Sequence, residues 1–233
     1  MKKFQLPALA ALTLFLSSCL GPAKINKWVD NHYGESLNAS SKTKADYIAV
    51  TSPLVTADLK ASETKKQVKN VLPLLFYWQF DYVNTCILNP KIPVNNFRSA
   101  VQAYANSKGL KQKLNGQKIE LSVDKMPNVF VLNDRSHMVW VIYAFGWDNI
   151  SFRPDNQELV VSYKITKDNV ETGKGVVTIP NTDKVLGLRF LQSVHKATDK
   201  YLDQYNENIK TMSKVAVDKI IADVTAQNTV MVK

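Results

Sequence analysis

Apolar and polar residues alternate along two stretches in the middle of the chain, residues 119–123 and 159–165. An alternation of period two is typical of strands that bury one face against a core. Residues 176–179 are also apolar and follow the second stretch after a polar segment, 167–173. Because such a short connection can join only antiparallel neighbours, we predict a hairpin there and an antiparallel sheet.

The most apolar stretch beyond the N-terminus is residues 71–88, which are rich in aromatic and β-branched side chains. A proline and several polar residues interrupt it, and its longest apolar run is too short to cross a bilayer. The composition predicts a long, mostly buried strand. Phe76, Trp78 and Phe80 could instead line a groove for an apolar ligand, and the pattern leaves both readings open.

Shorter signals predict the remaining strands. Residues 47–50 favour a strand, whereas the polar, lysine-rich residues 56–70 favour a surface loop. Residues 129–132 and 137–145 are apolar and flank the polar segment 133–136. Turn residues between two apolar runs are typical of a hairpin, so we predict a turn at 133–136.

Three segments favour helices. Asn95 is suited to cap a helix that runs to Lys108, where Gly109 would end it. Apolar residues recur every three or four positions over 183–226, which predicts a long C-terminal helix capped by residues 181–183. An unbroken helix over that range would measure about 65 Å, so we expect a break or an overhang beyond the sheet. A short helix could form at 27–32.

The order of these elements predicts the fold class. Strand, helix, antiparallel strands and a long helix favour an α+β fold, with two layers and an antiparallel sheet packed by a short helix and a long C-terminal helix. We expect this domain over residues 46–226, preceded by a tether at 19–45 and followed by a tail at 227–233.

The N-terminus has the three parts of a secretory signal peptide. Residues 1–3 carry two lysines, residues 4–16 are mostly apolar, and two serines then precede Cys19. A cationic segment, an apolar core and small residues before a cleavage site define such a signal, which predicts removal of residues 1–18. The apolar core is shorter than the 20 or so residues of a membrane-spanning helix.

Leu16, Ser17, Ser18 and Cys19 resemble the lipobox of bacterial lipoproteins. That resemblance implies acylation of the Cys19 thiol, cleavage before it and attachment to a membrane through the lipid. Leu20 stands where an aspartate would retain such a protein in the inner membrane, which favours the outer membrane and a periplasm-facing body. A plain secretory signal that happens to contain a cysteine is the alternative.

The charge of the chain is strongly positive, +10 at pH 7, and lysine supplies most of it. Nucleic-acid readers favour the planar fork of arginine, and this chain has few arginines, so we expect no nucleic-acid partner. A lysine-rich exterior suits a position near anionic lipid head groups. Once Cys19 is acylated, Cys86 has no partner for a disulfide, and its apolar neighbours favour a small buried residue over a reactive thiol.

Catalytic and metal-binding patterns are weak in this sequence. The three histidines fall in separate predicted elements, so we expect no metal site and no cofactor apart from the lipid on Cys19. The sequence contains no motif of a known nucleophile or phosphate loop, so we assign no catalytic residue. Other candidates are carboxylates that could pair in space and aromatic rings that suit sugar stacking or hairpin packing: Asp81, Asp124, Asp148, Glu158, Trp140, Tyr143 and Trp147.

The body is similar in size and element order to the ABC-transport auxiliary and lipopolysaccharide-assembly lipoproteins. That similarity implies a non-enzymatic binding or accessory role in envelope assembly or lipid transport, with a protein partner in the envelope. Two alternatives stay open. The body could carry a hydrophobic ligand between the sheet and the long helix, or it could be a hydrolase that uses some of the carboxylates.

Overall fold

The structure is a computed structural model. It describes residues 21–34, 45–56, 63–72, 76–140, 143–189 and 192–230. The predicted signal peptide and the predicted lipobox, Leu16, Ser17, Ser18 and Cys19, lie outside the described residues.

Two sheets make up the β part of the described fold. The four-stranded sheet has the order β1 (Ile48–Thr51), β4 (Lys118–Lys125), β7 (Leu159–Lys167), β8 (Val170–Ile179), with β1 parallel to β4 and the other pairs antiparallel. The five-stranded sheet is antiparallel throughout and has the order β2 (Glu63–Leu72), β3 (Tyr77–Ile87), β5 (Val129–Trp140), β6 (Ala144–Pro154), β9 (Leu186–Gly187).

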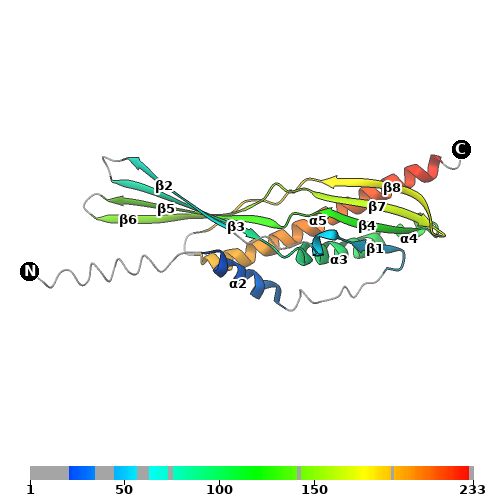
Figure 1. The fold of residues 1–233 in the computed structure, drawn as a ribbon, viewed down its shortest axis with the longest axis horizontal. Coiled ribbons are helices and arrows are strands. Elements are labelled where there is room, and N and C mark those ends of the chain that lie inside the picture. The colour runs from blue at the N-terminus through cyan, green and yellow to red at the C-terminus, as the bar shows by residue number, and fades with distance from the viewer. Residues whose placement is uncertain are drawn as a thin grey trace, which may run out of the picture.

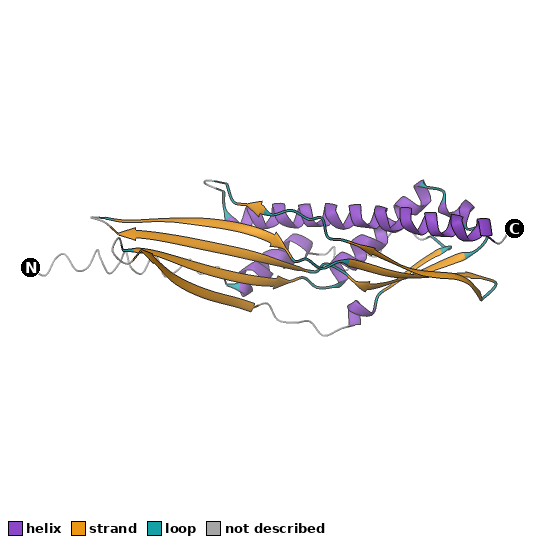
Figure 2. Ribbon diagram, turned by 90° about the horizontal axis from the view of Figure 1, so that it is seen from above, coloured by secondary structure: helices purple, strands orange, loops and turns teal. Residues whose placement is uncertain are grey.

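The helices lie along these sheets and complete an α+β fold (Figure 1). Seen from above, the two sheets follow one another along the length of the molecule, and the longest helix runs beside them (Figure 2). The helices are α2 (Pro22–Tyr33), α3 (Lys91–Ser107), the one-turn α4 (Leu110–Lys113), the 3₁₀ helix η2 (Pro53–Thr56) and α5 (Val194–Val230). The predicted α+β class is therefore confirmed, with two sheets where one was expected.

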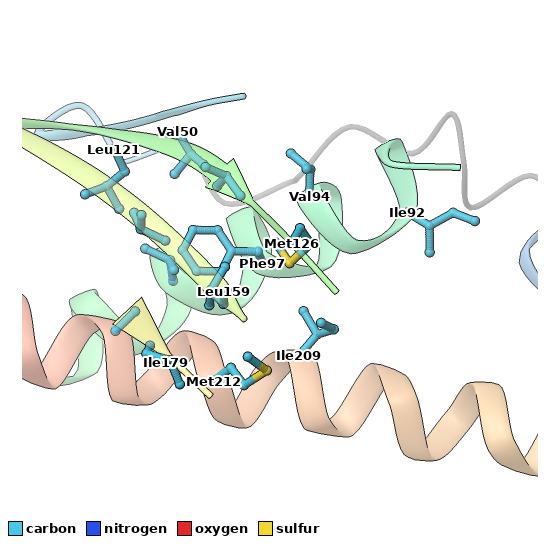
Figure 3. Close-up of a cluster of buried hydrophobic side chains, with 14 of the residues drawn as sticks. Val50, Ile92, Val94, Phe97, Leu121, Met126, Leu159, Ile179, Ile209 and Met212 are labelled. Carbon is cyan, nitrogen blue, oxygen red and sulfur yellow. The ribbon is translucent and has the colours of Figure 1, made fainter. Parts of the chain in front are cut away.

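The core of the four-stranded sheet lies between its inner face and helices α3 and α5 (Figure 3). Phe97 of α3, Leu121 of β4 and Leu159 of β7 are fully buried there, in the same cluster as Met212 of α5. The alternation that predicted strands in the sequence is the alternation of these buried positions, since Ile119, Leu121 and Val123 are buried and the residues between them are not. The predicted hairpin of residues 159–179 is likewise confirmed as the β7–β8 pair.

The predicted tether at 19–45 is wrong for residues 22–33, which form α2. Pro22 begins this helix because the first helical position needs no N–H donor and favours the fixed φ of proline. Ile25, Val29 and Tyr33 recur at helical spacing and are buried in the main core. The segment therefore belongs to the folded body, and the predicted short helix at 27–32 is part of a longer one.

The predicted hairpin turn at 133–136 is also wrong, because these residues lie within the continuous strand β5. They pair with β3 on one side and with β6 on the other. Polar residues are tolerated here because this part of the sheet is not covered by a helix, so their side chains remain partly in water (Figure 1). The long strand predicted over 71–88 begins at Tyr77, and the loop predicted over 56–70 contains most of β2.

Both long helices begin elsewhere than predicted. Helix α3 begins at Lys91 rather than at Asn95, because Pro93 lies in the first turn, where a missing N–H breaks no helical bond. Its predicted end is confirmed, since Gly109 adopts φ +64°. Helix α5 begins at Val194, and the Ser193 hydroxyl accepts a hydrogen bond from the Lys196 N–H at 3.2 Å.

Helix α5 then runs unbroken for 37 residues, about 55 Å, so the break, one of the two expected outcomes, does not occur. The helix continues to Val230, so the tail predicted at 227–233 is wrong for residues 227–230. Two sheets placed one after the other give this helix a long surface to pack on, which a single small sheet could not (Figure 2). Residues 183–193, predicted as its first turns, instead contain β9, which pairs with β6.

Candidate functional site

The five-stranded sheet extends well past the helices that cover its inner end (Figures 1 and 2). Phe152 of β6 stacks on Tyr201 of α5 with ring centroids 5.5 Å apart, which places these two residues at the same level. Tyr201 lies seven residues after the start of α5, or about 10 Å. Tyr143 lies nine residues before Phe152 along extended chain, or about 30 Å. The strands therefore extend about 20 Å beyond the helix start.

Aromatic side chains are exposed at the outer end of this extension. We call residues 76–80, 136–140 and 143–147 the aromatic tip, and they come from β3, β5 and β6 together with the residues next to their turns. Large apolar side chains that are exposed together on a soluble protein mark interaction sites more often than chance exposure does. The exposed fractions of the five most accessible rings are 56% for Phe76, 56% for Trp140, 73% for Tyr143, 60% for Phe145 and 47% for Trp147.

One face of the aromatic tip carries a ladder of stacked rings. His137 stacks on Trp147 with centroids 4.9 Å apart and on Tyr77 with centroids 5.9 Å apart. The Tyr77 hydroxyl and His137 Nδ1 are in hydrogen-bond contact at 2.7 Å. Strands β3, β5 and β6 thus contribute one ring each to the ladder, and contacts among the three rings fix their positions without a ligand.

The opposite face carries the three residues that the sequence suggested for an apolar groove. Phe76 and Trp78 lie with their ring centroids 6.1 Å apart, and Phe80 follows on the same face of β3. Trp78 pairs in register with Met138 of β5, which extends the apolar surface across the sheet. Phe76 is exposed and the other two are half-buried, so the prediction of a mostly buried strand is wrong at this end of β3.

On β3, β5 and β6, charged residues begin directly behind the aromatic tip. Arg135 Nε donates to Asp81 Oδ1 at 2.7 Å, and Gln79 Nε2 donates to Asp81 Oδ2 at 3.0 Å. Asp81 is buried, so this ion pair closes the inner border of the tip on one face. Within residues 76–80, 136–140 and 143–147 there is no lysine, arginine, aspartate or glutamate.

Asp134 lies at the inner border of the aromatic tip on the other face, and the pKa of its carboxyl is raised. This pKa is raised to about 6, chiefly by burial and also by the nearby Asp148 charge, while a hydrogen bond from Ser136 opposes both effects. An aspartate in an unfolded chain titrates near 3.9. The folded chain therefore holds this proton more tightly, and the stabilisation is complete below about pH 4 and lost as the pH rises through about 6.

Asp134→Asn is expected to stabilise the protein at neutral pH and to change nothing in acid. At about pH 7.5 the wild-type carboxylate is charged and poorly solvated, whereas the amide carries no charge. Because Asp134 is only partly buried, solvent screening limits the gain to about 1 kcal/mol, or about 2–4 °C in Tm. Thermal unfolding at about pH 7.5 and about pH 4 measures it. Asp30→Asn, at an exposed position of α2, is the control, and an equal gain at both pH values would contradict the assignment.

The structure brings together two histidines that the sequence placed in separate elements. His32 Nδ1 of α2 lies 3.3 Å from Asp199 Oδ1 of α5, and His195 Nε2 lies 3.8 Å from the other oxygen of the same carboxylate. Trp28 also stacks on His195, with centroids 5.1 Å apart. These contacts join α2 to α5. Among the described residues, no group of three or more His, Cys, Asp or Glu side chains is placed to hold a metal ion.

Asp124 and Cys86 are accounted for by their surroundings, whereas Glu158 is exposed to solvent. Asp124 accepts hydrogen bonds from the Ser122 and Ser162 hydroxyls on the four-stranded sheet. Cys86 is buried, as predicted, and burial raises the pKa of its thiol to about 12, which leaves it unreactive.

Two open depressions lie away from the aromatic tip. One of about 500 Å³ lies on the four-stranded sheet beside Glu120, Lys164 and Lys174, and one of about 470 Å³ lies between Tyr104 of α3 and Lys214 of α5. Packed side chains occupy the space between sheet and helix that a carried ligand would need (Figure 3). Neither depression combines apolar lining with enclosure, so the tip remains the stronger candidate for a binding surface.

The sequence pointed to six rings of the aromatic tip, but neither to Phe145 nor to the position that the rings share. Trp140, Tyr143 and Trp147 were attributed to sugar stacking or hairpin packing, and Phe76 belonged to another segment. The available signal was a strand whose neighbouring positions, Tyr77 and Trp78, are both aromatic, so that rings point to both faces.

Of the helices in the described ranges, none combines the length and the apolar character needed to cross a bilayer. No family model, no curated protein and no solved structure matches this chain.

Proposed function

We propose that this chain is a lipid-anchored protein of the bacterial envelope that acts by binding, as an accessory protein in envelope assembly or lipid transport, and that the aromatic tip is its binding surface. The observation that supports this proposal is a set of exposed rings, held on strands that project beyond the helices (Figure 1). We propose an outer-membrane location with the body facing the periplasm, as the lipobox resemblance implies.

The exposed rings favour a binding role because folding does not require them. Exposed aromatic surface contributes little to stability and raises the risk of aggregation. Edge strands with apolar side chains add to that risk. A chain that keeps Trp140, Tyr143 and Phe145 in this position gains most from them when they are covered by a ligand.

The described carboxylates favour binding over hydrolysis. Asp81 is paired with Arg135, and Asp124 is held by two serine hydroxyls. A glycosidase-type acid and base would have to flank a substrate across an open cleft. Asp134 and Asp148 instead lie on an open face of the sheet, at the border of the aromatic tip.

Cys19→Ala is expected to abolish acylation of the chain and to leave residues 1–18 attached. The reason is that only a thiol at this position can take the acyl chain that the lipoprotein pathway adds before cleavage. Metabolic labelling with a fatty acid, followed by mass measurement of the N-terminus, checks both results. Cys86→Ala is the matched control and should keep the label, because the Cys86 thiol is buried. Equal labelling of the Cys19→Ala and wild-type chains would contradict the proposed anchor.

The binding surface is tested in the same cells with a photoreactive residue. Placed at Phe145, in the aromatic tip, it should form adducts with lipid or protein in the native envelope. Val170 is the matched control, since it is equally exposed but lies at the turn between β7 and β8, at the other end of the molecule (Figure 1). Adduct yields no higher at Phe145 than at Val170 would contradict a binding role for the tip.

A further inference from the structure

We infer that the aromatic tip inserts into the head-group region of the bilayer that holds the acyl chains on Cys19, so that the chain contacts one leaflet at two points. This inference rests on the proposed lipid anchor and names the ligand of the aromatic tip as the phospholipid surface itself.

The first support is the direction of α2. Trp28 stacks on His195 near the start of α5, and the Tyr33 hydroxyl donates to Asn206 Oδ1 further along it, at 3.0 Å. The two helices therefore run parallel and begin at the same end of the molecule. That end faces the projecting strands, so the chain enters the fold on the side of the aromatic tip (Figure 1).

The second support is the length of chain between the anchor and the fold. Helix α2 begins at Pro22, level with the start of α5 (Figure 1). Cys19 is three residues further, and three residues span at most about 10 Å. The acyl chain itself then has to span the remaining distance of about 10 Å, out of the roughly 20 Å by which the strands extend past α5. An acyl chain on Cys19 can therefore reach the plane of the aromatic tip without unfolding α2.

The third support is that rings lie on both faces of the aromatic tip. Tyr77 and Trp147 belong to the ladder on one face, and Trp78 and Trp140 lie on the other. A protein partner would cover one face of the sheet, whereas a lipid surface surrounds an inserted ribbon on both. Trp and Tyr are also the residues that concentrate at membrane–water interfaces, where the ring is in an apolar layer and the polar atom in water.

The charge distribution sets the depth of insertion. The uncharged segments of the aromatic tip are five residues long, or about 16 Å of strand, and Asp81 and Arg135 follow directly. Among the described residues, no strand pairs with the outer edge of β6 at positions 144–149. Unpaired backbone groups are too costly in hydrocarbon, so the tip lies among hydrated head groups rather than across the bilayer.

The charge of the whole chain favours an anionic surface. The chain carries a net charge of +10 at pH 7, and a lysine close to an anionic membrane surface gains about 1 kcal/mol from the surface potential. A surface that contains phosphatidylglycerol therefore suits this chain better than a neutral one.

The experiment measures tryptophan quenching by brominated lipids. The acylated wild-type chain is reconstituted into vesicles of equal parts phosphatidylethanolamine and phosphatidylglycerol, with bromine near the head group or deep in the acyl chain. We expect the shallow bromines to quench emission more strongly than the deep ones. The variant with Trp140→Phe and Trp147→Phe should lose the quenching of these two rings and keep only that of the half-buried Trp78 in the tip, whereas Trp28→Phe, which removes a ring on α2, should retain it all.

Each outcome decides one proposal. An acylated chain whose quenching is unchanged by the Trp140→Phe and Trp147→Phe pair overturns the inserted tip and leaves the anchor standing. Stronger quenching by the deep bromines overturns the head-group placement. A chain that carries no acyl group overturns the proposed anchor, and with it the shared leaflet. Because phenylalanine keeps the apolar surface of the tip, the paired variant reports where the rings lie rather than a failure to fold.

Discussion

Phe152→Ala is expected to lower the free energy of unfolding by about 3–5 kcal/mol, whereas Phe145→Ala, on the same strand, should change it by less than about 0.5 kcal/mol. Phe152 is fully buried between Phe130 and Tyr201, where β6 meets α5. Its removal leaves a cavity at the joint between sheet and helix. Phe145 lies seven residues earlier in the aromatic tip and is 60% exposed, so no cavity forms when it is truncated.

Urea unfolding followed by far-UV circular dichroism measures both changes. The pair is matched in residue type, strand and substitution, and differs only in what surrounds the ring. A cost above about 2 kcal/mol for Phe145→Ala would show that the aromatic tip is packed against part of the protein, and the proposed binding surface would then be a structural contact.

Ile25→Ala is expected to destabilise the protein by about 2–5 kcal/mol. Ile25 is fully buried in the main core, although it lies only six residues after the proposed lipid site at Cys19. The lost methylenes leave a cavity beneath α2, so we also expect faster amide exchange over residues 22–33. Equilibrium unfolding and hydrogen exchange together separate a global effect from local release of the helix.

Lys27→Ala is the control for this change, because Lys27 is exposed on the same helix and should cost less than about 0.5 kcal/mol. Similar costs for the two variants would mean that residues 22–33 act as the tether that the sequence predicted. Release of α2 would also lengthen the connection between anchor and body, so the docked helix is what keeps the proposed acyl group near the level of the aromatic tip.

Local sequence patterns correctly predicted the strands that have one face on the core and one in water, and the end of one helix. The alternation over 119–123 and 159–165 became β4 and β7, because each of these strands has one face on the core and one in water. Gly109 ended α3 as predicted, since a left-handed residue after a helix is favourable for glycine. These signals depend on only a few neighbouring residues, and the predicted strands and helix end are present in the structure.

Predictions failed where tertiary packing overrode the local signal. The polar residues at 133–136 suggested a turn, but their neighbours in β3 and β6 hold them in a continuous strand. Residues 183–193 continue the helical spacing, but pairing of β9 with β6 and the cap at Ser193 start α5 later. Residues 22–33 were expected to be a tether because their burial depends on α5, which lies far away in the sequence.

The sequence by itself determined the α+β class and the positions of the regular strands, because these follow from propensity and periodicity over a few residues. Only the tertiary structure decided that the sheet is two sheets, that α2 belongs to the core, and that Phe76 and Tyr143 share one exposed surface. The physical reason is that burial depends on which elements cover a side chain. An aromatic ring has the same local pattern whether a helix covers it or the strand runs on past the end of that helix.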